Sequence, residues 1–288
     1  MKILYIKHHM HDKNHHALIN YKTINLYVID NIGTLDSIDL SMFDCVYSPC
    51  IPIDVNKYPN TKFLFGPHFS VFPEKQQMDI IRRNKVLYAQ PSEWAAKIWQ
   101  DNELCKNIKV ESLPFGVDIE KFKDTKPKSE RTKVVIYFKR RHPNELRFVT
   151  DFLSAKNIEY RIFNYLERYN ENEYLNYLQN SKFCFWLDAH ESQGFALEEA
   201  LSCDVPLIVW NIKTMKQEHG SSYTDIPATT IPYWDERCGE YFYDANELEN
   251  VYDLFISKLE TYKPREYIVE NLSIQKCEEK FVNLINSF

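Results

Sequence analysis

Two glutamates, Glu191 and Glu199, stand eight positions apart in the stretch of the chain best suited to chemistry. The apolar residues 183–187 precede them and predict a short buried strand, while residues 195–203 predict a helix. Gly194 lies at the turn between the two, where a glycine permits a tight backbone approach. A helix that begins at the carboxyl end of a strand favours anions, because its N–H groups and its dipole both attract negative charge.

Carboxylates beside such a turn are unsuited to holding a phosphate, but they suit neutral hydroxyl groups such as those of a sugar or a ribose. We therefore expect Glu191 and Glu199 to bind a sugar nucleotide, with backbone N–H groups near Gly194 and Phe195 facing its phosphates. The alternative is structural: Glu199 would be a solvated helix carboxylate, and Glu191 would only complement the helix dipole.

With Gly194 and Phe195 between them, the two glutamates resemble the Glu-x7-Glu motif of the retaining glycosyltransferases of family 4. Residues 200–209 resemble the continuation of that motif, a helix end of small residues, a turn, Val-Pro and a strand. The resemblance spans nearly the whole chain and is firmest over residues 113–209. It implies an α/β protein of the GT-B fold, with two Rossmann-like doubly wound domains facing a cleft.

The resemblance also implies a role for each residue of the motif. Glu191 would hydrogen-bond the donor sugar as a catalytic residue, and Glu199 would bind the ribose hydroxyls. Gln193, Gly194 and Phe195 would complete the donor site.

A basic cluster of Lys139, Arg140 and Arg141 follows a predicted strand at residues 134–138. In the family, the corresponding strand ends in Gly-Arg with a Lys a few residues on, and both cations hold the donor diphosphate. Here the Gly is missing, and Asn144 stands about where the Lys would be. We expect Lys139 and Arg140 to bind the diphosphate; the alternative is a solvated basic turn.

His68 follows another predicted strand, at residues 62–65. In the family, a His in a similar position reaches the donor sugar, so the resemblance makes His68 a second catalytic candidate. The alternative is a loop histidine with purely structural contacts. Residues 113–122 resemble the segment that ends the family's N-terminal domain, with Phe115 in place of the usual Asn.

Five of the nine histidines lie within residues 7–16, directly after the first predicted strand. No Cys accompanies them, so we expect this loop to line an acceptor pocket rather than to bind a metal. No Asp-x-Asp motif, which metal-dependent glycosyltransferases use, occurs in the sequence. We expect no metal and no cofactor; the nucleoside-diphosphate sugar is a substrate.

The net charge is −6 and the sequence holds no long basic run, which argues against nucleic acid as a partner. No run approaches the roughly 20 apolar residues of a membrane-spanning helix. The first residues predict a strand rather than a signal peptide. The seven cysteines form no Cys-x-x-Cys pair, which favours free thiols in a reducing compartment. We expect a cytoplasmic protein without a transmembrane segment.

Strand-like runs alternate with helical patterns in both halves of the chain, which favours parallel sheets covered on both faces. The expected organisation is an N-terminal acceptor domain at residues 1–122, a polar linker at 123–131, a C-terminal donor domain at 132–262, and a final segment at 263–288 whose helix crosses back to the N-terminal domain.

The expected function is transfer of a sugar from a nucleoside-diphosphate sugar to a glycan or another hydroxyl acceptor, with retention of configuration and without a metal. One alternative is a sugar-nucleotide epimerase on the same fold, which needs acid and base groups around the sugar. The other is a non-catalytic protein that binds a sugar nucleotide or a glycan. The donor base, the donor sugar and the acceptor cannot be read from the sequence.

Overall fold

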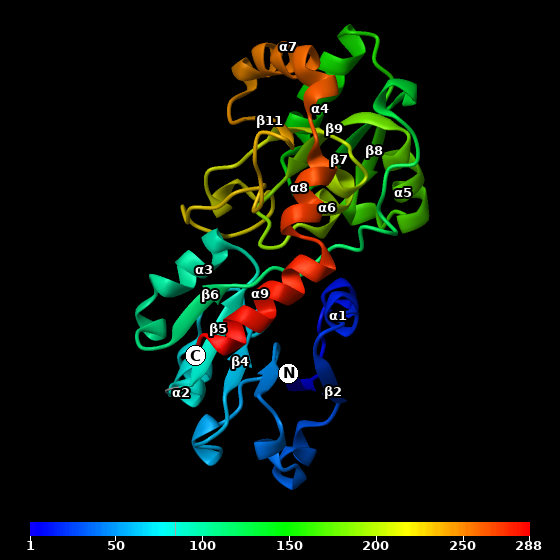
Figure 1. Cartoon of the computed structure of the whole chain (residues 1–288). Coiled ribbons are helices and arrows are strands. Elements are labelled where there is room, and N and C mark those ends of the chain that lie inside the picture. The colour runs from blue at the N-terminus through cyan, green and yellow to red at the C-terminus, as the bar shows by residue number, and fades with distance from the viewer. Residues whose placement is uncertain (84) are drawn as a thin grey trace. The chain divides into compact units, whose positions relative to one another are not determined.

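The computed structural model describes residues 1–83 and 85–288. The chain divides into two compact units. The first unit comprises Met1–Gly116 and Ile274–Phe288, and the second comprises Val117–Ser273. Each unit is built on one parallel β-sheet with helices against it (Figure 1).

The first unit has a six-stranded sheet in the order β2-β1-β3-β4-β5-β6. Its chain order reverses between β1 and β3, which makes the carboxyl ends of these two strands the switch point of the sheet. The strands are β1 (Lys2–Ile6), β2 (Asn25–Ile29), β3 (Cys45–Ser48), β4 (Phe63–Phe65), β5 (Val86–Gln90) and β6 (Lys109–Ser112), and the helices are α1 (Asp12–Ile19), α2 (Lys75–Ile81), α3 (Glu93–Gln100) and α9 (Ile274–Asn286).

Helices cover both faces of this sheet, as the buried strands require. On one face, the ring of Tyr88 in β5 stacks on that of Trp99 in α3 with centroids 4.1 Å apart. On the other face, Phe281 of α9 packs edge-on against Tyr47 of β3 at 5.6 Å. The last helix therefore belongs to the core of the first unit, although more than 150 residues of chain separate it from β6 (Figure 1).

The second unit has a five-stranded parallel sheet in the order β11-β10-β9-β7-β8. Here the switch point lies between β7 and β9, at the carboxyl ends of two adjacent strands. The strands are β7 (Lys133–Lys139), β8 (Arg161–Asn164), β9 (Ser181–Asp188), β10 (Leu207–Trp210) and β11 (Gly239–Phe242), and the helices are α4 (Pro143–Ala155), α5 (Glu171–Gln179), α6 (Phe195–Ser202), α7 (Leu248–Lys258) and α8 (Pro264–Asn271).

The core of the second unit is rich in aromatic rings. On one face of its sheet, Tyr137 of β7 stacks on Trp186 of β9 at 4.1 Å. On the other face, Phe183 of β9 packs edge-on against Phe255 of α7 at 5.6 Å. The segment predicted as a linker packs on this unit too, because the buried guanidinium of Arg131 donates to the carbonyls of Cys203 and Asp204 at 3.1 and 3.0 Å.

The strand expected after Val-Pro in residues 200–209 is β10, and the predicted helix at 195–203 is α6, one residue shorter. The sequence analysis did not predict α1, α2, α8 or β11, which are short or polar. Among the described residues, no helix combines the length and the apolar character that crossing a membrane would need. All seven cysteines are free thiols, and six of them are buried.

Candidate functional site

Lys139 and Asp188 end the two strands that flank the switch point of the second sheet. Lys139 is the last residue of β7 and Asp188 the last of β9. The Lys139 Nζ lies 3.9 Å from the Asp188 Oδ2 and forms an ion pair with the carboxylate of Glu191. The same ammonium group lies 4.7 Å from the centroid of the Tyr165 ring. The site thus places one cation against two carboxylates, where open α/β sheets bind their ligands.

Sequence reasoning did not select Asp188. Its side chain is 2% exposed. Burial raises the pKa of its carboxyl to about 6, although the charge of Lys139 opposes this rise. Within the described part of the chain, its Oδ1 atom is buried without a hydrogen-bond partner. The available signal was an acidic residue that closes an otherwise apolar strand, three positions before Glu191.

The loop after β9 is held by residues 229 and 230, which the sequence analysis did not select. The carbonyl of Thr229 accepts a hydrogen bond from the Glu191 N–H at 3.1 Å. The hydroxyl of Thr230 donates to the Asp188 carbonyl at 3.0 Å. Asn211, which follows β10, accepts from the Thr230 N–H at 2.9 Å. These contacts hold the backbone that carries Glu191.

Arg141 stabilises the start of the same loop. Its side chain is fully buried, and its Nη1 donates to the carbonyls of Asp188 and Trp210 at 3.2 and 2.6 Å. The carboxylate of Glu145 pairs with this guanidinium at 2.8 and 2.7 Å. Arg141 therefore ties together the ends of β9 and β10, which is a structural task.

Gly194 has the left-handed backbone that the turn into α6 requires, with φ of +80° and ψ of 44°. It is the residue before the first helical position, and Phe195 begins α6. The first N–H groups of a helix have no partner within the helix, which is why a turn of this kind is suited to binding an anion. A Cβ added at Gly194 would stand 3.5 Å from Pro232 and 3.6 Å from the Glu191 Cβ, in ordinary contact.

Glu199 is buried in α6, with 2% of its surface exposed, which excludes the solvated helix carboxylate. After burial itself, the charge of Glu199 is among the causes that raise the pKa of the Tyr169 and Tyr174 hydroxyls, so these rings lie close to it. Gln193 is also buried and donates to the Glu198 carboxylate at 2.6 Å. Glu199 thus sits in an aromatic, largely dry environment.

Arg140 differs from its neighbour Lys139. Its backbone is left-handed, with φ of +51°, and its half-exposed guanidinium pairs with Glu218 at 3.0 Å. The second oxygen of Glu218 lies 3.2 Å from the Nδ1 of His190. Burial lowers the pKa of His190, while Glu218 acts in the opposite direction. The structure therefore brings Lys139 to the carboxylates of the site and joins Arg140 to a separate acidic partner.

His68 belongs to the first unit, where it follows β4. The Nε2 of its ring lies 2.8 Å from the Nδ2 of Asn14 on α1. Its backbone N–H donates to the Pro49 carbonyl at 2.9 Å. Burial lowers the pKa of His68 to about 4, with a further contribution from His11. The imidazole is consequently neutral near pH 7, and it offers hydrogen bonds rather than charge.

The histidine-rich loop runs into α1. His11 caps this helix by accepting from the Lys13 N–H at 3.3 Å, and the His15 Nδ1 lies 3.3 Å from the Tyr5 hydroxyl. Over residues 1–83 and 85–288, no three His, Cys, Asp or Glu side chains are grouped so as to hold a metal ion.

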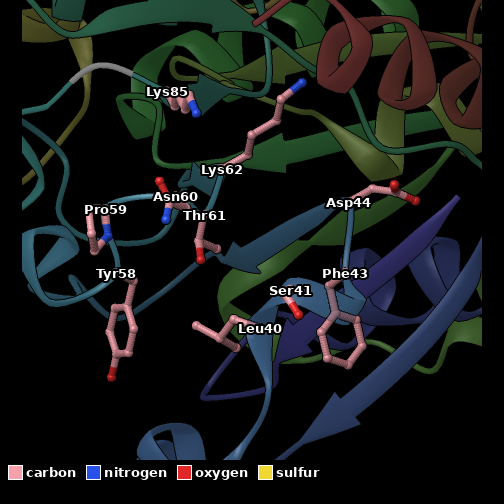
Figure 2. A pocket seen from close by; sticks show the side chains of 10 residues that line it. All are labelled: Leu40, Ser41, Phe43, Asp44, Tyr58, Pro59, Asn60, Thr61, Lys62 and Lys85. Atoms are coloured by element: carbon pink, nitrogen blue, oxygen red, sulfur yellow. The ribbon is translucent and has the colours of Figure 1, made fainter.

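A cavity of about 480 Å³ lies in the first unit, away from the carboxyl edge of its sheet (Figure 2). Its walls are the segments that precede β3, β4 and β5, which is the amino edge. Because open parallel sheets bind ligands at the carboxyl edge, this cavity does not belong to the predicted site. Its lining residues are Leu40, Ser41, Phe43, Asp44, Tyr58, Pro59, Asn60, Thr61, Lys62 and Lys85.

No protein-family model matches the chain, and no curated protein matches its sequence. Solved structures do resemble its fold. Sucrose-phosphate synthase from Thermosynechococcus elongatus is 12% identical with a TM-score of 0.57, and the match covers 100% of this chain and 98% of that one. The N-terminal domain of trehalose-6-phosphate phosphatase from Candida albicans is 11% identical with a TM-score of 0.55, over 99% and 96% of the two chains.

The catalytic domain of starch synthase IV from Arabidopsis thaliana, solved with ADP and acarbose, is 10% identical with a TM-score of 0.55, over 88% and 74% of the two chains. At such identities the likeness shows the fold alone. The predicted fold class is confirmed: the chain is an α/β protein of the GT-B class with two parallel sheets.

Proposed function

We propose that this protein is a glycosyltransferase that moves a sugar from a nucleoside-diphosphate sugar to a hydroxyl acceptor. One observation carries the proposal: Lys139, Glu191 and the helix-opening turn at Gly194 meet at the switch point of the second sheet. A cation and a helix N-terminus suit a diphosphate, and a carboxylate beside them suits sugar hydroxyls.

The donor occupies the second unit in this proposal. The leaving nucleoside diphosphate gains negative charge as the glycosidic bond breaks, and fixed donors aimed at that charge lower the barrier. Lys139 and the first N–H groups of α6 are those donors. Glu191 accepts hydrogen bonds from the donor sugar, and buried Glu199 accepts them from the ribose.

The likeness of fold supports a donor with a nucleoside diphosphate. Starch synthase IV, whose fold is similar, was solved with ADP, a nucleoside diphosphate. Because one fold hosts many activities, the support for this chain comes from its own side chains at the switch point.

The resemblance to family 4 also implies that the reaction retains the anomeric configuration. We assign no enzymatic nucleophile. The positive charge of Lys139 and the dipole of α6 take the place that a metal ion has in other glycosyltransferases. The acceptor is a glycan or another hydroxyl compound bound by the first unit. His68, a catalytic candidate by the resemblance, is neutral near pH 7 and offers hydrogen bonds. We place the protein in the cytoplasm.

A sugar-nucleotide epimerase is the second candidate, and Asp188 is the observation that favours it. A carboxyl whose pKa is about 6 suits general acid and base catalysis near neutral pH. A transferase and an epimerase would both use the donor site, but only the transferase needs an acceptor.

The test has two stages. Thermal unfolding is first measured with UDP-, GDP- and ADP-sugars, because a ligand that binds the native state raises the melting temperature. The sugar nucleotide with the largest effect is then supplied with the label in its sugar. Label in a new glycoside supports the transferase, and label in an isomeric sugar nucleotide supports the epimerase. A protein that no sugar nucleotide stabilises contradicts both.

A further inference from the structure

Among the residues that the structure describes, Lys139 alone forms an ion pair with Asp188. The same ammonium group also pairs with Glu191. Its side chain is 18% exposed, and those of the two carboxylates are 2% and 15% exposed. One positive charge therefore faces two acids in a largely dry environment. Burying an excess negative charge is costly, and a proton taken from solvent relieves that cost.

The groups around Asp188 make it the acid that takes this proton. Burial is the main cause that raises the pKa of its carboxyl to about 6, and Glu218 adds to the rise. Lys139, a hydrogen bond from the backbone N–H of Ala189, and Arg141 act in the opposite direction, in decreasing order. The guanidinium of Arg141, however, is directed to the Asp188 carbonyl and is already paired with Glu145.

The remaining ionisable neighbours do not stabilise a negative charge on Asp188. Burial raises the pKa of the Tyr137 hydroxyl in β7 and of the Tyr169 hydroxyl after β8. The negative charge of Asp188 raises both pKa values further. His190 lies two positions along the chain, and burial lowers its pKa, so it is no cation near pH 7. Lys139 is thus the largest of the influences that keep Asp188 ionised.

We propose that Asp188 is a positioning residue that exchanges Lys139 for a proton: when the diphosphate of a sugar nucleotide takes the Lys139 ammonium, Asp188 binds a proton from solvent. This inference rests on the proposed function, because the diphosphate belongs to the donor. The step forms one O–H bond on the carboxyl, and no other covalent bond changes. The protonated carboxyl becomes a hydrogen-bond donor beside the bound anion.

The direction of the pH effect follows from this exchange. In the free protein, burial raises the pKa of Asp188 to about 6, and the charge of Lys139 limits this rise. Once the diphosphate engages Lys139, that opposition weakens and the pKa of Asp188 rises above 6. Between these two values, binding takes up a proton, so affinity increases as the pH falls from about 7.5 to 6 and levels off below. One proton changes the dissociation constant by at most about tenfold per pH unit.

The experiment is calorimetric titration with UDP-glucose, GDP-mannose and ADP-glucose at pH 6, 6.75 and 7.5. Each titration is run in PIPES and in imidazole, whose ionisation enthalpies differ, so that the proton uptake is measured directly. In these sugar nucleotides the diphosphate is a diester and has no group that titrates in this range. The wild type is expected to take up a fraction of a proton and to bind three- to tenfold more tightly at pH 6 than at pH 7.5.

Asp188→Asn is expected to lose both the proton uptake and the pH dependence while still binding the ligand. Asp204→Asn is the matched control, because Asp204 also has a raised pKa and a lysine partner, Lys128 at 3.1 Å, but lies before β10 at the amino edge of the sheet. It should keep the uptake of the wild type. Asp188→Ser replaces Asp188→Asn if that variant does not fold.

Binding by the wild type without proton uptake, or equal uptake in Asp188→Asn, overturns the inference and leaves the proposed function standing. If no sugar nucleotide binds the wild type at any pH, the proposed function and the inference fall together.

Discussion

Lys139 and Glu191 are joined in an ion pair at the switch point of the second sheet, although the proposed reaction gives them different ligands. In that proposal, Lys139 binds the diphosphate and Glu191 binds the sugar. We therefore expect a donor to separate the two side chains when it binds, so that each contacts its own ligand.

Glu191→Gln should separate binding from transfer. The amide removes one of the two carboxylates that pair with Lys139, so affinity for the nucleoside diphosphate is expected to stay equal or to increase. Transfer should fall roughly 10- to 100-fold, because a hydrogen bond to a charged group contributes about 1.5–3 kcal/mol. Calorimetry and initial rates measure the two effects. Glu173→Gln, in an exposed ion pair with Arg161, is the control. Equal losses of affinity and rate would contradict the assigned role.

Lys139→Ala and Arg140→Ala should differ in their effect on donor binding. Lys139→Ala is expected to weaken nucleoside-diphosphate binding more than tenfold, whereas Arg140→Ala changes it less than threefold, because Glu218 already engages that guanidinium. Loss of Lys139 also removes the cation that Asp188 and Glu191 share, so unfolding should become easier by about 1–3 kcal/mol. Titrations at a temperature where both variants are folded decide the order, and the reverse order would exclude Lys139 as the main diphosphate ligand.

Gly194→Ala tests the turn that opens α6. An L-residue at φ of +80° is strained, which costs about 1–2 kcal/mol of stability. Gly220 has the same φ, and a Cβ there would meet nothing within 4 Å, so Gly220→Ala carries a similar backbone cost. Both variants should melt earlier than the wild type, but only Gly194→Ala should bind the donor less tightly. Equal donor affinity in the two variants would argue against an anion site at this turn.

His68→Asn should change the pH dependence of stability. The pKa of His68 is lowered to about 4, below its ordinary value, so the unfolded chain binds more protons between pH 4 and 6.5. Stability contributed by neutral His68 is therefore present above pH 6.5 and lost as the pH falls. From pH 7 to pH 5 this loss is about 2 kcal/mol in the wild type and absent in the variant. Urea unfolding at the two pH values measures it; parallel losses in both proteins would be the contrary result.

A chelator should leave transfer unchanged, since Lys139 and the dipole of α6 supply the positive charge in the proposed mechanism. Initial rates are compared before and after dialysis against EDTA, and again after Mg²⁺ or Mn²⁺ is added. A rate that depends on either ion would return attention to the histidines of residues 8–16.

The strands and the main helices could be predicted because their signal is local. Val134 and Phe138 belong to one continuous apolar run, which is how a strand buried on both faces appears in sequence. The helix after Gly194 could be predicted for the same reason. The elements that were missed depend on partners elsewhere: α1 is polar along most of its length, and its buried Asn14 approaches His68 of a distant segment.

The sequence by itself determined the positions of Glu191, Gly194 and Glu199 around one strand-to-helix turn, since residues so near in the chain keep their spacing in any fold that forms that turn. Only the tertiary structure decided that Lys139 ends the neighbouring strand and pairs with Glu191, because strand order is set by packing of the whole sheet. The same holds for the cation of Asp188, because Lys139 lies on another strand and the pairing of the two strands brings the side chains together.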